Sequence, residues 1–442
     1  MGISKRVIVI IGVGILLFTL GRLSPGFAVE FQPIGFEALS MGGAGVAQAK
    51  GSFSVYYNPA LLAESHKGVE ISFSVGTGAR EINLVDHIDT LADIDITSTL
   101  DRIVDNAPTG SNSTGDRNNI TTIKNELRDI AQINGLQLMP TASVGVRMGS
   151  IGLGVFGVSE GSAYAVIDSN KLDIIVKKTI SGTDQYFKYD EGSDTYSLST
   201  QSEYESKSLE YALNNDLTYL QLTGLAYTEV PLAYACQIKT PLGAVSLGAA
   251  IKYMYAITYD NKIKIDTESG EIEDVSKEAD KRDDDWGIDV GLLYRPPAIQ
   301  NLLIGVTAKN INQPEFATIK GNKYKLDPMV RAGFSWELLN KISFAFDVDL
   351  TKNDTFLPGY ASRYVGGGVN IHPTSWISLR AGLMDNVEES REGVVYTAGI
   401  GFGLKWAQID ISGQYSSKSG EYNGQTIPRY GRVQIALVSK WF

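Results

Sequence analysis

The amino-acid sequence predicts an all-β protein, a transmembrane antiparallel β-barrel of about 14 strands with an N-terminal luminal hatch. Three features of the chain support this prediction. From residue 69 onward, apolar residues alternate with small or polar ones over stretches of about ten residues. The connections between these stretches alternate between short and long. A segment rich in Gly, Ala and Ser precedes the first stretch. We expect a signal peptide at 1–28, the hatch at 29–68 and the barrel at 69–442.

The clearest alternation lies at 342–350, ISFAFDVDL, where large apolar residues alternate with small or acidic ones. A period of two with one wholly apolar face is typical of a strand that separates two different solvents. The same pattern recurs at 69–75, 141–148, 151–158, 230–238, 244–255, 285–295, 302–309, 329–336, 363–371, 376–383, 394–404, 408–415 and 431–441. With 342–350 these stretches make an even number of strands, as in bacterial single-chain barrels.

The connections give an independent indication of the topology. The short ones are 149–150, 240–243, 296–300, 337–340, 372–375 and a bend near Lys405. The long ones are 78–140, 160–229, 256–284, 310–328, 351–362, 385–393 and 416–430. Outer-membrane barrels have short periplasmic turns and long extracellular loops. The alternation therefore predicts that both termini lie on the periplasmic side.

The long loops differ in composition. Apolar residues at helical spacing within 84–133 predict a helical hairpin laid over the outer mouth. The polar segment 181–208 is expected to be extended. The segment 260–285 carries eleven acidic and five basic residues. Such a run is either a solvated face or a cation-bridged contact with lipopolysaccharide.

The first 28 residues have the pattern of a secretory signal peptide. Lys5 and Arg6 precede an apolar run at 7–20, and Gly26-Phe27-Ala28 is a small-x-small cleavage site. The run is too short for a comfortable membrane span. We therefore expect cleavage near Ala28; the alternative is an uncleaved N-terminal anchor.

The segment 40–63, SMGGAGVAQAKGSFSVYYNPALLA, contains four glycines and ends in a turn signal. It is either a compact segment fitted into the barrel lumen or an ordinary Gly-rich loop. In the first case Tyr56 and Tyr57 offer apolar rings with polar tips along a ligand path. Asn58 and Pro59 then fix the turn that seats the segment.

Charged residues within the strands should point into the lumen, because Lys or Arg at mid-bilayer costs about 2–4 kcal/mol. The strand charges considered are Arg147, Lys252, Asp289, Arg331, Asp347, Asp349, Arg380 and Asp410. Their mixed signs favour paired charges around a plug over an ion-selective pore. With Trp336 opposite Ile342, Arg331 pairs with Asp347 across neighbouring strands; a register shift of two pairs Arg331 with Asp349.

The sequence offers little for catalysis, metals or nucleic acids. His66, His87 and His372 lie at separate places in the predicted topology, so none joins a triad, and we expect no enzyme. No Cys/His cluster suggests a metal, and no cofactor is expected. The single cysteine, Cys236, excludes an internal disulfide, and the net charge of −11 argues against nucleic acid. Gly366-Gly367-Gly368 indicates close backbone approach or a bend in the wall.

Two runs resemble known families. VYYNPALLA at 55–63 resembles the YYNPAGL-type signature of the FadL/TodX family of outer-membrane proteins, with Leu61 in place of Gly and 49–52 departing from the usual Asp-Asp-Ala-Ser. The stretch Tyr324–Asp354 is similar to the branch known as plasmid-transfer TraF-like proteins. The first resemblance implies a barrel in the outer membrane, surrounded by lipid and lipopolysaccharide, with the N-terminal segment as a hatch.

The resemblance also implies a function, the transport of small hydrophobic molecules, fatty-acid-like or aromatic, across the outer membrane. The alternative is a non-transporting accessory barrel of a conjugation or secretion apparatus. An apolar pocket beneath the loops, continuous with a gap in the wall, favours transport. A solidly filled lumen with an exposed apolar patch favours the accessory role. An outer-membrane hydrolase is a third and weaker alternative, because no triad is seen.

Overall fold

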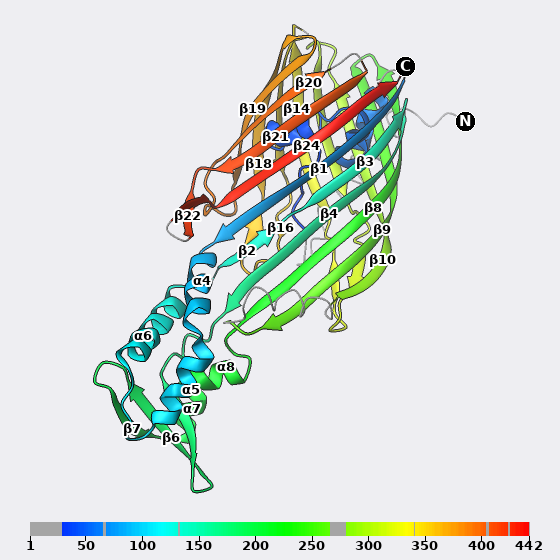
Figure 1. Ribbon diagram of the computed structural model, residues 1–442. Helices are drawn as coiled ribbons and strands as arrows, with labels where there is room; N and C mark the ends of the chain where they lie inside the picture. The colour runs from blue at the N-terminus through cyan, green and yellow to red at the C-terminus, as the bar shows by residue number, and fades with distance from the viewer. Residues whose placement is uncertain are drawn as a thin grey trace.

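A closed antiparallel β-barrel forms the body of the molecule in the computed structural model (Figure 1), which describes residues 29–64, 68–130, 133–265, 280–339, 341–403, 406–422 and 425–441. One sheet of 15 strands closes on itself, because β1 pairs with both β24 and β3. The short strand β2 shares with β3 a single position between β1 and β4. The barrel therefore has 14 strand positions, and the predicted architecture is confirmed.

Every predicted strand is present. The barrel strands are β1 (Val69–Ile82), β2 (Gly135–Leu138), β3 (Thr141–Met148), β4 (Ile151–Val166), β8 (Tyr219–Thr240), β9 (Gly243–Ile263), β10 (Asp280–Arg295), β11 (Leu302–Lys309), β14 (Met329–Leu338), β15 (Ile342–Asp349), β18 (Tyr364–Thr374), β19 (Ile377–Asn386), β20 (Val395–Gly403), β21 (Ala407–Ser416) and β24 (Tyr430–Trp441). Several extend beyond their predicted ends, so the expected loops 78–140, 160–229 and 256–284 are too long. β8 alone begins eleven residues before the predicted Val230.

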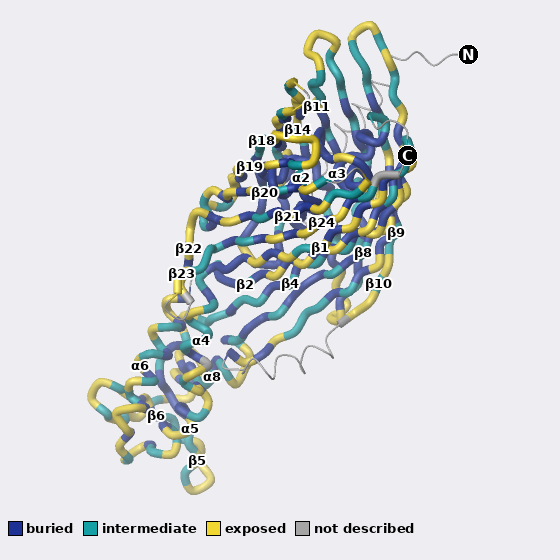
Figure 2. Tube along the Cα trace, turned by 45° about the horizontal axis from the view of Figure 1, so that its top comes forward, coloured by how far each residue is buried: buried dark blue, intermediate teal, exposed yellow. Residues whose placement is uncertain are grey.

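Buried residues alternate with exposed or partly exposed ones along the strands (Figure 2). In β1, Ile71, Phe73 and Val75 are exposed by 41–48%, whereas Ser72 and Ser74 are buried. In β15, Ser343, Ala345, Asp347 and Asp349 are buried between half-exposed apolar residues. The outer face of the barrel is therefore apolar, as the alternation predicts.

A separate lobe stands at the end of the barrel opposite the C-terminus (Figure 1). It contains α4 (Val85–Ile94), α5 (Ile96–Asn106), α6 (Thr114–Asp129), β5 (Ile175–Ile180), β6 (Thr183–Asp190), β7 (Thr195–Ser199), α7 (Gln201–Lys207) and α8 (Leu209–Asn214). The lobe has its own apolar core, which includes Leu91, Ile123 and Val176. The expected hairpin over the mouth is wrong: three helices project away from the barrel. The segment 181–208 is extended in β6 and β7, as expected, but ends in the helix α7.

The other long connections carry small hairpins, namely β12 (Glu315–Ala317) with β13 (Lys323–Lys325), β16 (Asn353–Asp354) with β17 (Ala361–Ser362), and β22 (Ser419–Tyr422) with β23 (Gln425–Pro428). The signal-peptide prediction at 1–28, His66 and most of the acidic run at 260–285 lie outside the described residues. Within the described ranges, no helix has the length and apolar character needed to cross a membrane.

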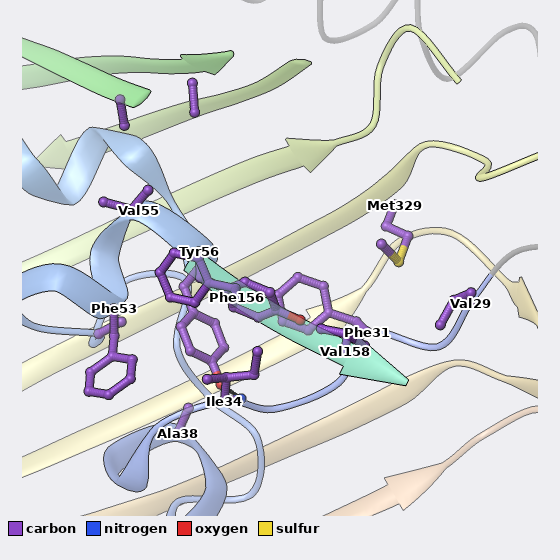
Figure 3. Close-up of a cluster of buried hydrophobic side chains, with 14 of the residues drawn as sticks. Val29, Phe31, Ile34, Ala38, Phe53, Val55, Tyr56, Phe156, Val158 and Met329 are labelled. Carbon is purple, nitrogen blue, oxygen red and sulfur yellow. Dashed lines mark hydrogen bonds between the residues drawn. The ribbon is translucent and has the colours of Figure 1, made fainter. Parts of the chain in front are cut away.

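The N-terminal residues 29–64 lie inside the barrel, and we call them the luminal segment. The segment contains α2 (Phe36–Ser40), the 3₁₀ turn η1 (Gly51–Phe53), α3 (Ser54–Tyr57) and η2 (Pro59–Glu64). Nearly all of its residues are buried, and its apolar side chains share one core with inward-facing wall residues (Figure 3). The structure therefore agrees with the first interpretation of 40–63, a compact segment fitted into the barrel lumen.

Candidate functional site: the filled lumen

The core of the lumen is aromatic. Tyr56 of the luminal segment lies 5.5 Å from Phe31 and 5.5 Å from Phe156 of β4, measured between ring centroids (Figure 3). The Lys309 ammonium sits 3.4 Å from the centroid of the Tyr56 ring, in cation–π geometry. These contacts tie the segment to β4 and β11 of the wall.

The wall is shaped to the backbone of the luminal segment by glycines. A Cβ added to Gly366 of β18 would overlap the Gly42 carbonyl, and one at Gly368 would meet the Met41 Cα at 2.7 Å. Across the barrel, a Cβ at Gly248 of β9 would overlap Pro59 and Ala60. The run Gly366-Gly367-Gly368 therefore marks close backbone approach, one of the two expected alternatives.

The four candidate ligand-path residues form hydrogen bonds and turns that hold the segment together. The Tyr56 hydroxyl donates to the Gln32 carbonyl at 2.8 Å, and the Tyr57 hydroxyl accepts from the Ile34 N–H at 2.8 Å. Asn58 Nδ2 donates to the Val46 carbonyl at 2.9 Å, and Pro59 opens η2. Burial raises the pKa of both tyrosines far above the ordinary value, so both remain neutral hydrogen-bonding groups.

The predicted pair Arg331–Asp347 is wrong by two residues. Arg331 faces Asp349, and its Nε donates to Asp349 Oδ1 at 2.5 Å. Strand β14 continues to Leu338, and the turn is completed through Leu339 with a positive φ of 53°, which shifts the register. Asp347 instead accepts two backbone N–H bonds from the luminal segment, from Gly45 at 2.7 Å and Val46 at 3.0 Å. It therefore anchors the segment to the wall.

All eight charged residues predicted to face inward are buried: Arg147, Lys252, Asp289, Arg331, Asp347, Asp349, Arg380 and Asp410. Lys252 pairs with Asp289 at 3.0 Å and with Glu229 at 2.8 Å. Arg380 pairs with Asp410, and its Nε also donates to Ser40 Oγ of the luminal segment at 2.9 Å. Ion pairs between residues of opposite charge therefore surround the segment, as the mixed signs indicate.

A second cluster of charges, missed in the sequence, lies toward the lobe end of the lumen. Arg80 of β1 pairs with Glu30 of the luminal segment at 2.8 Å and also with Glu392. Its guanidinium donates to the Tyr364 hydroxyl at 2.8 Å. Burial raises the pKa of Glu30, and the positive charge of Arg80 opposes that rise. We call Glu30, Arg80, Glu160, Glu392 and Arg432 the upper network.

Spaces of very different size lie along the barrel. One of about 680 Å³ lies where the lobe joins the rim, and Leu127, Ile130, Tyr164, Ile167 and Leu172 are among the residues that line it. Midway down, the space beside Phe31 and Arg331 is only about 10 Å³. A polar cavity of about 340 Å³ lies at the end with the short turns. The lumen is therefore closed between two open ends.

The wall is also continuous where the chain passes from β2 to β3. Gly78 and Met139 exchange both backbone hydrogen bonds, at 3.1 and 2.8 Å, and the Ser159 N–H donates to the Pro140 carbonyl at 3.1 Å. The Met139 side chain turns inward and is fully buried. No lateral gap opens at this point of the described wall.

Of the three histidines, the two that the structure describes lie far apart. His87 lies in the lobe, with Nδ1 2.6 Å from Glu126, whereas His372 lies in β18 near the opposite end of the barrel. Among the described residues, no group of three or more His, Cys, Asp and Glu side chains is placed to hold a metal ion.

Fold and lumen together define a plugged β-barrel with an apolar outer face. The model of the family described as "F plasmid transfer operon, TraF, protein" matches residues 55–350, about two thirds of the chain. The chain belongs to this family, and the expected TraF branch is confirmed. No curated protein matches it.

The chain also resembles solved FadL/TodX-type barrels over nearly its whole length. The toluene transporter TbuX of Ralstonia pickettii has 13% identity and a TM-score of 0.48, covering 93% of this chain and 100% of that one. The toluene transporter TodX of Pseudomonas putida has 10% identity and a TM-score of 0.45, covering 95% and 99%. A FadL homologue of Pseudomonas aeruginosa has 9% identity and a TM-score of 0.46, covering 94% and 99%.

Proposed function

We propose that the protein is an outer-membrane barrel of the Gram-negative type that transports small hydrophobic molecules, fatty-acid-like or aromatic. The cavity where the lobe joins the rim carries this proposal. Its volume of about 680 Å³ and the apolar part of its lining, which also includes Arg128, Asn134 and Ser169, can accommodate a small ligand that is mainly apolar. It lies outside the closed part of the lumen, where a solute arriving from outside the cell would be held first.

The luminal segment is the proposed hatch. Tyr164 lines the outer cavity and also packs against the cluster of Ile82, Leu357 and Tyr360 directly below. The Tyr360 hydroxyl bonds to Glu392 of the upper network. A solute moving inward therefore meets the network and then the segment around Tyr56 and Tyr57, and its passage requires the segment to shift.

The surroundings of the barrel follow from its outer face. The half-exposed apolar side chains of the strands suit the acyl chains of outer-membrane lipid and lipopolysaccharide. Export to that membrane requires a signal peptide, and we propose cleavage near Ala28.

The test is solute binding and uptake with the cavity narrowed. Ile167→Trp places a large ring in the cavity, and Leu198→Trp, at an 81% exposed site elsewhere on the lobe, is the matched control. Cells or proteoliposomes that contain each variant are given radiolabelled toluene or oleate. We expect Ile167→Trp to reduce uptake several-fold and Leu198→Trp to leave it unchanged. Equal uptake by Ile167→Trp and the parent would contradict the cavity's role.

The closed lumen favours a second candidate function, a non-transporting accessory barrel of a conjugation or secretion apparatus. The space midway down the barrel is only about 10 Å³, and the matching family is described by a plasmid-transfer operon. The two candidates differ in what co-purifies. A hydrophobic small molecule found by mass in a lipid extract of the purified protein supports transport. Transfer components captured by cross-linking at the lobe, with no such molecule, support the accessory role.

A further inference from the structure

The first residues of the luminal segment are buried in the upper lumen. Val29 and Glu30 are each only 2% exposed. Val29 belongs to the apolar core and lies near Phe31 and Met329 (Figure 3). If the proposed signal peptide is removed after Ala28, the new chain terminus forms at this buried position. The inference developed here rests on that proposed cleavage and does not depend on the transported solute.

The upper network is short of one positive charge. It contains the carboxylates of Glu30, Glu160 and Glu392 but only the guanidinium groups of Arg80 and Arg432. All five residues are at most 2% exposed. Burying a charge without a partner is costly, so the network is balanced either when one of its carboxylates takes up a proton or when one more cation lies at this level of the lumen.

Glu160 is the member of the upper network whose carboxylate has an oxygen without a hydrogen-bond partner. Its Oε1 accepts from Gln137 Nε2 at 2.7 Å and from the Phe356 N–H at 3.1 Å. Its Oε2 is buried without a hydrogen-bond partner. The backbone N–H of Glu30 is close enough to act on the same carboxylate. One residue spans at most about 3.6 Å of chain, so the nitrogen of Val29 is within one residue's reach of the Glu30 N–H that acts on this carboxylate.

Signal-peptide cleavage supplies the missing cation. Hydrolysis of the Ala28–Val29 bond leaves a carboxylate on the released peptide and an amine on Val29. That amine takes up a proton at neutral pH, because an α-amino group ordinarily titrates near pH 7.7–8.0. An uncleaved chain has a neutral amide at this position and cannot provide the charge.

We propose that Glu160 is the binding site for the mature N-terminus: the Val29 ammonium pairs with Glu160 Oε2 and neutralises the upper network. Removal of the signal peptide then locks the luminal segment in place. Arg80–Glu30 and the Val29–Glu160 pair fasten its first two residues to β1 and β4, which are close neighbours in the wall.

The test uses the full mature barrel purified in detergent. Intact mass identifies the first residue, and an amine-reactive probe at neutral pH measures the accessibility of the α-amine before and after unfolding. A Gly-Ser-Gly insertion between Ala28 and Val29 moves the amine away from the site. Thermal unfolding midpoints are compared for the parent, Glu160→Gln, the insertion, and both together. Glu388→Gln, which removes an acid from the more exposed pair with Arg363, serves as the control background.

We expect a chain that begins at Val29 and an amine that reacts only after unfolding. The insertion should lower the midpoint in the parent and in Glu388→Gln but have little further effect in Glu160→Gln. A different first residue, an amine equally reactive in the folded barrel, or additive effects in Glu160→Gln would each overturn the proposal. Uptake is not part of this test, so its failure leaves the proposed transport function standing.

Discussion

At the scale of single residues, Asp347 and Asp349 have different roles: Asp349 pairs with Arg331, whereas Asp347 binds the luminal segment. The sequence alone cannot tell which residue has which role. Both are acidic, both face inward by parity, and they are two positions apart on β15. Only the length of the preceding turn decides which one faces Arg331. Because Leu339 adopts a left-handed conformation without being Gly or Asn, the sequence gives no signal of the turn's true position. The alternation along the strand predicts which residues face inward, but it does not predict which residue of the neighbouring strand each one faces.

This division gives a testable contrast. Asp349→Ala leaves Arg331 buried without its ion-pair partner and should destabilise the barrel by about 3–5 kcal/mol. In an Arg331→Ala background the same change should cost much less, because the pair is already broken. Asp347→Ala removes the acceptor of the Gly45 and Val46 N–H groups and should loosen the luminal segment. Denaturant unfolding in detergent checks all three; strong coupling of Arg331 to Asp347 instead of Asp349 would contradict the register.

At the scale of elements, strands were predictable and the lobe was not. A strand between lipid and lumen must alternate, so each of the 14 left a direct pattern in the sequence. The upper network was missed because Arg80, Glu160 and Glu392 were assigned to loops, where charge carries no structural information. The lobe packs its own core from β5, α6 and other short elements, and such short elements have no strict period.

A single substitution can disrupt the close contact between a wall glycine and the luminal segment. In Gly366→Ala the new methyl group overlaps the Gly42 carbonyl, so the segment must move, at a cost of about 1–3 kcal/mol. Gly161→Ala in β4 is the control, because open space surrounds its Cβ position. We expect both variants to insert normally, with only Gly366→Ala showing raised conductance in planar bilayers. Unchanged conductance in Gly366→Ala would contradict a sealing role for this contact.

The alternation of short and long connections predicts which end of the barrel faces the outside of the cell. A protease site inserted within 106–119, which spans the end of α5, the connection and the first turns of α6, should be cleaved when intact cells are treated with protease. A site inserted at 296–300, in the turn between β10 and β11, should be cleaved only after the outer membrane is opened. The opposite accessibility would invert the orientation proposed for the barrel.

At the scale of the whole molecule, the barrel and the luminal segment are separable in principle. The strand ladder of the barrel contains no residue of the luminal segment, so a chain that lacks 40–63 should still form the barrel. This deletion removes Tyr56 and Tyr57 from the aromatic core and leaves paired charges of the wall facing water. We expect insertion into the outer membrane with a large rise in single-channel conductance. A deleted chain that inserts but conducts like the parent would show that the segment does not seal the lumen.

The pairing of β1 with β24 also sets the order in which the molecule can be assembled. Val69 lies opposite Trp441, so the last strand to be synthesised completes the enclosure. Contacts between residues so distant in the chain form late and slowly. The luminal segment touches β18 on one side and β9 on the other, so its contacts with the wall are complete only when this seam has closed. A chain that stops short of β24 would therefore lose both its last strand and the enclosure that retains its first residues.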